Sequence, residues 1–170
     1  MADPEFTTPG SAGEPFIPKD VALKKALVVT DFSPDASAAI DYALKLAKLA
    51  GIQIALLHIV EVPTYQIHPE VVAARKRVDE TFEAMRQRAA ERLEALAEIV
   101  RNEGVSCTAS VRLGIPTEEI LTEAEKTKPD LIFIGNKGTS ALARFLLGST
   151  AERVVRYARC SVLVVRAKAE

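Results

Sequence analysis

The stretch GNKGTSALARFLLGST, Gly135 to Thr150, decides how the chain folds, because an apolar run precedes it and a helical pattern follows its last glycine. Its three glycines are spaced G-x2-G-x9-G, with a hydroxyl residue directly after the third. The run Asp130–Gly135 predicts a buried strand, and Ser149–Ala158 predicts a helix. The glycines therefore bracket a loop at the carboxyl end of a strand, where open α/β sheets bind ligands.

Outward from this loop, short apolar runs alternate with longer helical patterns along the chain. Strands are predicted at Ala26–Thr30, Ile52–Val60, Val105–Leu113, Asp130–Gly135 and Ser161–Arg166. Helices are predicted at Pro34–Ala50, from Pro69 to about Asn102, at Pro116–Thr127 and at Ser149–Ala158. This alternation predicts a parallel five-stranded sheet with helices on both faces, without an internal repeat or a second domain.

Local signals mark the ends of several helices. Ser33 is a predicted N-cap with Pro34 in the first helical position, and Gly51 closes that helix. Thr117 is the predicted cap of the helix before the fourth strand. In the long helix after the second strand, apolar residues recur at steps of three and four, which predicts one buried face opposite a charged, solvated face. The apolar residues of this face are Val78, Phe82, Met85, Ala89, Leu93, Leu96 and Val100.

The composition favours one domain and disfavours two classes of partner. With 170 residues, of which 48% are hydrophobic, the chain has enough apolar side chains for one core. Its net charge of −1 attracts neither nucleic acid nor anionic lipid, and its low aromatic content, without tryptophan, disfavours base stacking. No apolar run approaches the ~20 residues that span a bilayer. We therefore expect no nucleic-acid partner and no membrane contact.

Two further features favour a cytoplasmic protein. Cys107 and Cys160 lie beside apolar strand-like runs and match no metal-ligand spacing, so we expect reduced packing residues. The N-terminus has no basic-then-apolar signal peptide. Residues 1–20 are rich in proline and show no periodicity, so we expect an expression tag and a disordered lead-in there, with the folded domain at 21–170.

Each glycine of the loop has a predicted part in holding a ligand. Gly135 lets the backbone approach a ligand without a Cβ in the way, and Gly138 permits a tight turn. Gly148 precedes a helix start whose free N–H groups and dipole favour an anion. Between the first two glycines, Lys137 adds a point charge that suits phosphate. The convergence of these residues on one edge of one sheet favours a binding site.

A structural explanation of the same residues needs no ligand. The glycines are then ordinary loop residues, and Ser149 with Glu152 forms an S-x-x-E capping box. Asp31, beside Thr30 at the carboxyl end of the first strand, also has two explanations. It faces the glycine loop across the crevice and serves ribose hydroxyls or a hydrated divalent cation, or it only helps to cap the helix at Ser33.

The chain lacks the sequence motifs of several classes of enzyme. The chain contains neither the P-loop pattern G-x4-G-K-[ST] nor a G-x-G-x-x-G fingerprint after the first strand. HExxH and G-x-S-x-G are also absent. Of the two histidines, we interpret His58 in the second strand as a structural residue rather than a catalytic base, and His68 as an exposed linker residue.

These residues resemble the nucleotide-binding branch of the universal stress protein family. The resemblance rests on VVTDFS after the first strand, on ALLHIVE at the second strand, and above all on Gly135-x2-Gly138-x9-Gly148-Ser149. GSTAERVVRYARCSVLVVR follows as that family's closing helix and strand, so the resemblance covers about residues 23 to 167. It implies a three-layer Rossmann-like (adenine nucleotide alpha hydrolase-like) fold with strand order 3-2-1-4-5.

The resemblance also implies a site for ATP or another adenine nucleotide. Thr30 and Asp31 would hold the ribose, and the backbone around Ile54 would edge the adenine. Ile134 and Gly135 would line the base and the sugar. The phosphates would be surrounded by Gly138, Gly148, Ser149, Thr150 and Ala151. No residue would ligate a metal directly, and Mg²⁺ or Mn²⁺ bound with the nucleotide would reach Asp31 only through water.

The implied function is that of a nucleotide-binding stress-response or signalling module, more than that of an enzyme. One alternative is a slow metal-dependent ATP hydrolase or phosphotransferase in which Asp31 and a metal orient water, although the motif lacks a convincing base or arginine finger. Another is a dimeric scaffold whose loop binds nothing. Family members often pair through the last strand, so we expect a homodimer through Ser161–Arg166. Glu61–Pro69 contains two prolines and is expected to be a mobile lid over the adenine.

Overall fold

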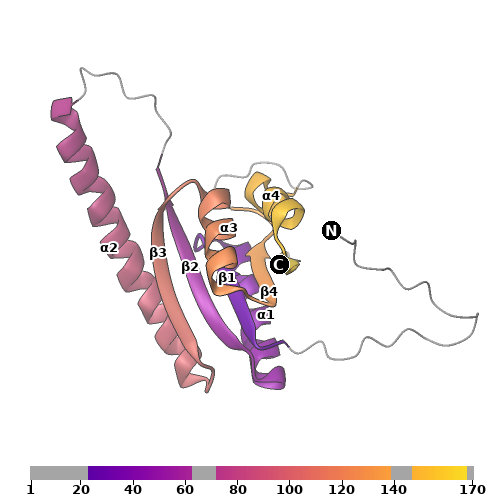
Figure 1. Ribbon diagram of the computed structural model, residues 1–170. Helices are drawn as coiled ribbons and strands as arrows, with labels where there is room; N and C mark the ends of the chain where they lie inside the picture. The colour runs from indigo at the N-terminus through magenta and orange to yellow at the C-terminus, as the bar shows by residue number, and fades with distance from the viewer. Residues whose placement is uncertain (1–22, 63–71, 139–146, 168–170) are drawn as a thin grey trace, which may run out of the picture.

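The structure, a computed structural model, describes residues 23–62, 72–138 and 147–167, with side chains in the second range described from residue 80. Strands and helices alternate along the chain (Figure 1). The strands are β1 (Lys25–Val29), β2 (Gln53–Glu61), β3 (Cys107–Gly114), β4 (Leu131–Gly135) and β5 (Ser161–Val165). The helices are α1 (Pro34–Ala50), α2 (Val72–Asn102), α3 (Pro116–Thr127) and α4 (Ser149–Tyr157). Every predicted element is present, and the bounds differ from the prediction by a few residues at most.

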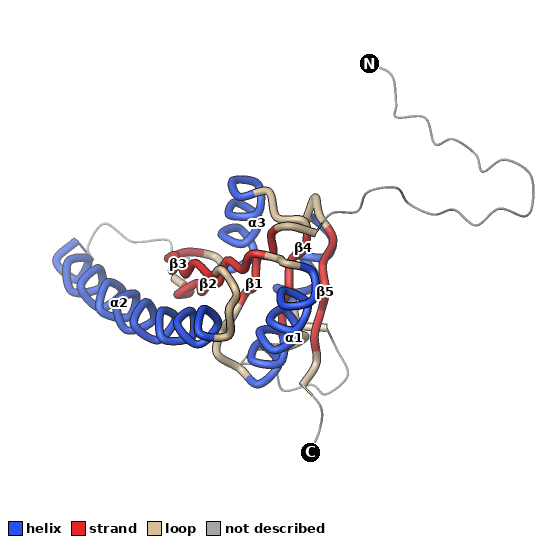
Figure 2. The backbone as a smooth tube through the Cα atoms, turned by 90° about the horizontal axis from the view of Figure 1, so that it is seen from below, coloured by secondary structure: helices blue, strands red, loops and turns tan. Residues whose placement is uncertain are grey.

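The sheet has the predicted strand order, β3-β2-β1-β4-β5, and all its neighbouring strands are parallel. Figure 2 shows α3 on one side of the sheet and α1 and α2 on the other. α4 contacts α3 and packs on β5, so it belongs to the same layer as α3. The three-layer α/β fold expected from the alternation is therefore confirmed.

An apolar core lies on each face of the sheet, because helices cover both sides of these parallel strands. Beneath α1 and α2, Val28 and Leu56 of the sheet pack with Leu93 of α2. Beneath α3 and α4, Leu27 and Leu57 belong to a second core. Successive residues of one strand thus enter different cores, which explains why β1 is apolar without alternation.

α1 begins and ends at the predicted residues. Ser33 has an extended backbone, and its hydroxyl oxygen accepts a hydrogen bond from the Ala36 N–H at 3.2 Å. Pro34 follows in the first helical position. At the other end, Gly51 closes the helix with a φ of 68°, a left-handed conformation that glycine adopts without strain.

The predicted Thr117 cap is wrong, and Ser149, considered as a cap in the explanation without a ligand, does not cap α4 either. α3 begins with Pro116 in the first helical position, so Thr117 lies inside the helix. α4 has Gly148 as its N-cap residue, and Ser149 is its first helical residue. Neither helix start has a capping bond from a side chain. The capping box of Ser149 and Glu152 is not formed, since its hydroxyl comes from inside the helix and not from the preceding cap position.

α2 confirms the predicted amphipathic pattern over its second half. Leu93 and Val100 are buried against the sheet together with Ala89 and Ala97. Met85, predicted on the same face, is 47% exposed. The physical reason is that α2 diverges from the sheet toward its N-terminal end (Figure 1), so this part of the apolar face has no strand beneath it.

The predicted lead-in at 1–20, His68 and the side chain of Val78 lie outside the described residues. The same holds for the predicted lid at Glu61–Pro69, of which only the first two residues are described. Within the ranges that the structure does describe, no helix is long and apolar enough to cross a bilayer.

Cys107 and Cys160 are both free, as expected, and neither is fully exposed. Burial raises the pKa of both thiols, so the reactive thiolate form is disfavoured near neutral pH. Both cysteines therefore act as small packing residues.

We expect Ser33→Ala to lower the free energy of unfolding by about 1 kcal/mol, because it removes the cap of α1. Ser149→Ala, the matched change at the start of α4, removes no cap and is expected to change this free energy by less than about 0.5 kcal/mol. Urea unfolding followed by far-ultraviolet circular dichroism measures both values. Equal losses would show that Ser149 also caps its helix.

Candidate functional site

A cavity opens at the carboxyl edge of the sheet, where β1 is shorter than its neighbour β2. β1 ends at Val29 opposite Leu57, whereas β2 continues beside β3 as far as Glu61. Past the end of β1, one more ladder bond runs from the Thr30 N–H to the Leu57 carbonyl at 2.9 Å. β1 then leads into α1 on one face of the sheet, and β4 leads into α4 on the other. Open α/β sheets form their crevice at such a reversal of connections.

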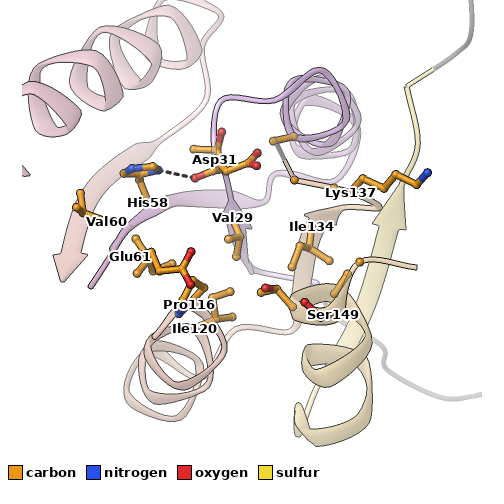
Figure 3. A pocket seen from close by; sticks show the side chains of 18 of the residues that line it. Val29, Asp31, His58, Val60, Glu61, Pro116, Ile120, Ile134, Lys137 and Ser149 are labelled. Carbon is orange, nitrogen blue, oxygen red and sulfur yellow. Dashed lines mark hydrogen bonds between the residues drawn. The ribbon is translucent and has the colours of Figure 1, made fainter. Parts of the chain in front are cut away.

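The cavity has a volume of about 570 Å³ and gathers residues from strand ends and helix starts (Figure 3). Its lining comprises Val29, Thr30, Asp31 and Ala36; His58, Ile59, Val60 and Glu61; Met85, Arg88 and Ala89; Pro116 and Ile120; Ile134, Gly135, Asn136, Lys137 and Gly138; and Gly148, Ser149, Thr150 and Ala151. All the predicted site residues are among them except Ile54. The fold therefore brings together segments that lie far apart in the sequence.

The start of α4 forms one end of the cavity. Its first internal hydrogen bond runs from the Glu152 N–H to the Gly148 carbonyl at 2.8 Å. The N–H groups of Ser149, Thr150 and Ala151 have no hydrogen-bond partner within the described residues. Together with the helix dipole, these donors make this end of the cavity attractive to an anion.

Gly135 is required because the start of α1 packs against it. A Cβ at this position would lie 2.8 Å from the Ala36 backbone nitrogen and 3.0 Å from the Asp35 carbonyl carbon. Two hydrogen bonds hold the contact: the Lys137 N–H donates to the Asp35 carboxylate at 3.1 Å, and the Ser33 hydroxyl donates to the Lys137 carbonyl at 3.3 Å. The close approach expected of a ligand is therefore made by the protein's own backbone.

Side chains at Gly138 and Gly148 would also collide with atoms of the protein itself. A Cβ on Gly138 would lie 2.8 Å from Oδ2 of Asp31, and one on Gly148 would lie 3.0 Å from the Asn136 carbonyl oxygen. The same carbonyl accepts a hydrogen bond from the Gly148 N–H at 2.8 Å. The two ends of the glycine loop thus lie side by side, which places the start of α4 at the crevice.

Asp31 combines features of both predicted roles. Its Oδ1 accepts a hydrogen bond from the Ser33 N–H at 3.0 Å, so it stabilises the turn that leads into α1. Its Oδ2 lies beside Gly138, so the carboxylate also borders the glycine loop across the crevice, as predicted. Thr30 is 2% exposed, and its hydroxyl oxygen accepts a hydrogen bond from the Phe32 N–H at 3.0 Å. Ribose binding by Thr30 and Asp31 stays a prediction.

Ile54 is the predicted site residue that the fold places elsewhere. It lies near the amino end of β2, opposite Ala26, and is 2% exposed in the core beneath α1 and α2. The cavity is at the opposite, carboxyl edge of the sheet, so the expectation for Ile54 is corrected. Ile59 is one of the β2 residues that line the cavity beyond the end of β1, together with His58, Val60 and Glu61.

Lys137 lines the cavity without directing its charge into it. Figure 3 shows the lysine side chain pointing away from Ser149 and Ile134. Its backbone is fixed by the hydrogen bonds to Asp35 and Ser33. The predicted point charge beside a phosphate is therefore not formed in this conformation.

The cavity is also lined by residues that the predicted site did not include. Figure 3 shows the side chains of Val29 and Ile120 in the middle of the cavity, and those of Pro116 and Glu61 farther from Ser149. Strand length is the sequence signal that could have predicted these residues, since β2 has nine residues and β1 has five. A strand that outruns its neighbour at the carboxyl edge presents its last residues to the crevice.

α3, which supplies Pro116 and Ile120, is held in place by ion pairs to β3. The Arg112 guanidinium pairs with Glu119 at 3.2 Å and also with Glu123, and these bonds raise its pKa. Both carboxylates belong to α3, and neither of these charged groups is exposed. The pairs therefore fix the distance between α3 and the sheet.

His58 borders the cavity but is held by structural contacts. Its Nδ1 donates a hydrogen bond to the Thr30 carbonyl at 2.8 Å, since a carbonyl oxygen can only accept. Its ring lies 4.6 Å from the Phe32 ring, centroid to centroid, and the Arg92 guanidinium lies 4.0 Å from the Phe32 centroid. These contacts hold Phe32 at a φ of 62°, which is costly for a bulky residue. The interpretation of His58 as a structural residue agrees with this arrangement.

Comparison with known proteins identifies the family of the chain. Residues 22–166 match the model of the universal stress protein family. The chain belongs to this family. Universal stress protein MJ0531 of Methanocaldococcus jannaschii is 33% identical to it over 143 residues, which cover 84% of the chain and 82% of the relative.

Solved universal stress proteins share the fold. UspA from Lactobacillus plantarum superposes with a TM-score of 0.77 at 26% identity, over 86% of the chain and 100% of UspA. A universal stress protein from Archaeoglobus fulgidus in complex with dAMP has a TM-score of 0.56 at 21% identity, over 85% of the chain and 98% of that protein. Because this identity is only 21%, the similarity to the dAMP-bound protein shows a shared fold and nothing more.

Gly135→Ala is expected to lower the free energy of unfolding by about 2 kcal/mol, because the new Cβ meets backbone atoms that cannot move aside. Gly104→Ala is a matched control with open space around its Cβ and a φ of 83°, so it is expected to lose only about 1 kcal/mol. Urea unfolding without ligand compares the two variants. An unchanged stability of Gly135→Ala would mean that this glycine serves only a ligand.

Proposed function

We propose that this universal stress protein binds an adenine nucleotide, with ATP as the first candidate, in the cavity at the carboxyl edge. The polarity of the cavity is the observation that supports this most strongly. N–H groups at the start of α4, without partners among the described residues, lie at one end, and the Glu61 carboxylate lies at the other (Figure 3). A complementary ligand carries an anion at one end and hydrogen-bond donors at the other. A nucleotide whose base has an amino group fits this description.

The middle of the cavity suits the apolar faces of a flat aromatic base. Val29, Ile120 and Ile134 belong to the core beneath α3 and α4 and also line the cavity. Its volume of about 570 Å³ lies within the usual range of small-molecule sites. The base would pack on these side chains with its edge toward the backbone of Ile59, in the role first expected of Ile54.

Two carboxylates would orient the remainder of the ligand. Asp31, beside Gly138, would accept hydrogen bonds from ribose hydroxyls, and Glu61 would accept one from the amino group of the base. Both carboxylates repel phosphate, so they would direct the phosphates to the donors of Ser149, Thr150 and Ala151. Within the ranges described, no cluster of three or more His, Cys, Asp or Glu side chains is suited to a metal ion. Mg²⁺ or Mn²⁺ would therefore be held mainly by phosphate and water.

We infer that the bound nucleotide acts as a signal, and a nucleotide complex of a relative supports the binding step. Another universal stress protein, with the same fold, has been solved with dAMP. We extend this to the present chain as a nucleotide-responsive module of a cytoplasmic stress response or signalling process, with hydrolysis at most slow. Nucleotide retained by the purified protein, identified by native mass spectrometry, is the direct test. Its absence, together with no binding of added ATP, would contradict the proposal.

Ser149→Pro tests the phosphate end with little change to the fold. Proline is favoured in the first helical position, where α1 and α3 carry Pro34 and Pro116. Gly148 has a φ of −62° and a ψ of 144°, a conformation that a following proline tolerates. The substitution therefore keeps α4 but removes one N–H donor that would bind phosphate. We expect ATP affinity, measured by isothermal titration calorimetry, to fall roughly 10-fold.

Ser149→Ala is the matched control, because it removes the hydroxyl and keeps the N–H. Its ATP affinity is expected to stay closer to that of the wild type than the affinity of Ser149→Pro. If both variants bind ATP as tightly as the wild type, the phosphates do not lie at the start of α4.

We also propose that the protein forms a homodimer through β5. This strand lies at the edge of the sheet, beside β4, and its residues Val162, Leu163 and Val164 are only partly buried. An apolar edge without proline favours pairing with another chain, and two copies of one strand pair naturally about a two-fold axis. Arg166 and the polar residues after it would limit further growth.

Val164→Lys is expected to shift the protein from dimer to monomer at micromolar concentration, because a charge on the paired edge opposes association. Thr108→Lys, an exposed position on the opposite edge strand β3, is the matched control and is expected to leave the dimer intact. Sedimentation velocity measures both. A wild-type protein that is monomeric under these conditions contradicts the proposal.

A further inference from the structure

Asn136 carries a buried polar group without a partner. The residue follows β4 directly and is 5% exposed. Its side-chain nitrogen, Nδ2, is buried and has no hydrogen-bond partner among the described residues. Most buried side-chain donors in proteins are paired, because an unpaired one loses its bonds to water without replacement. Asn136 therefore calls for a physical explanation.

The backbone of Asn136 is fixed on both sides. Its N–H donates to the Val165 carbonyl of β5 at 2.6 Å, and its carbonyl accepts the Gly148 N–H at 2.8 Å. The first bond extends the ladder between β4 and β5, and the second holds the residue before α4. Only the side chain is free to respond to a ligand. A turn about its Cβ–Cγ bond, a soft torsion, moves the Nδ2 donor without moving the backbone.

The side chain of Asn136 lies on the face of the sheet that α3 and α4 cover, beside the carboxyl edge where the cavity opens. Ile134 belongs to the core beneath α3 and α4, and Gly135 faces α1 on the opposite side. Because the residues of an extended chain alternate in direction, Asn136 returns to the face of Ile134. It also lines the cavity and borders Gly148, the N-cap residue of α4. Its carboxamide is therefore on the same side of the sheet as α4, whose first N–H groups have no partner among the described residues.

We propose that the Asn136 carboxamide donates a hydrogen bond to the anionic group bound at the start of α4, and so selects ligands that carry a phosphate. This inference rests on the proposed nucleotide site. Backbone N–H groups and one side-chain amide then form a single set of donors around the phosphate. Without ligand, Nδ2 has no partner among the described residues, and the ligand supplies the missing acceptor. A charged acceptor makes this a stronger hydrogen bond than a neutral one.

The test compares ATP with adenosine, which lacks the phosphates, by isothermal titration calorimetry. Asn136→Leu removes the donor at similar side-chain size, Asn136→Asp replaces it with a negative charge, and Asn136→Ser retains a hydroxyl donor. We expect Asn136→Leu to lower ATP affinity roughly 10-fold and Asn136→Asp to lower it further, with adenosine affinity changed less than about 2-fold. Asn136→Ser is expected to recover part of the ATP affinity.

Thermal unfolding without ligand supplies a second readout. Asn136→Leu is expected to unfold at the wild-type temperature or above it, because the variant no longer buries an unpaired donor. If Asn136→Leu does not fold, Asn136→Asp and Asn136→Ser form the comparison. Equal changes for ATP and adenosine, or unchanged ATP affinity in all folded variants, overturn the role of Asn136. A wild type that binds neither ATP nor adenosine overturns the proposed function itself, and the role of Asn136 with it.

Discussion

The point at which β1 stops is the constraint on which the carboxyl edge of this protein depends. The Thr30 carbonyl accepts its hydrogen bond from the His58 side chain rather than from the next residue of the ladder. The chain then turns through Phe32, at a φ of 62°, and α1 starts after Ser33. β2 runs on to Glu61 with β3 as its partner. The sheet therefore has a notch at its centre, and a cavity forms there instead of a closed row of strands.

The start of α1 then holds the glycine loop in place. The Asp35 carboxylate accepts hydrogen bonds from the Lys137 N–H at 3.1 Å and from the Ala167 N–H at 2.8 Å, so one side chain joins the segments that follow β4 and β5. Gly135 allows this approach, and Gly148 allows the other end of the loop to pack on Asn136. The packing explanation and the ligand explanation of the glycines are thus linked. Close packing of the protein's own backbone is what brings the helix donors to the cavity.

Charge within the cavity is arranged along its length, although the whole chain is nearly neutral. Backbone donors at the start of α4 face one end, Asp31 borders the glycine loop, and Glu61 lies at the far end. Because this arrangement is local, it cannot be predicted from the net charge of the chain. It gives a ligand one favourable direction, and apolar residues such as Val29 and Ile120 separate the two ends. In our proposal, Nδ2 of Asn136, which has no partner among the described residues, adds a donor at the end where an anion is favoured.

The sequence by itself determined the order of the elements, the parallel sheet and the edge at which the cavity lies. These depend on local periodicity, on signals such as Ser33 and Gly51, and on the rule that parallel strands end together. It failed at Ile54, which lies at the opposite edge of the sheet from the cavity, and at Thr117, which lies inside α3 instead of capping it. Both depend on tertiary contacts that the local pattern does not contain. Only the tertiary structure decided that Ile59 borders the cavity, since this depends on where β1 stops beside β2. It also decided which atoms fill the space beside Gly135 and Gly138, because those atoms come from the segment around Asp31 to Ala36, about a hundred residues away, and no local pattern of the sequence records them.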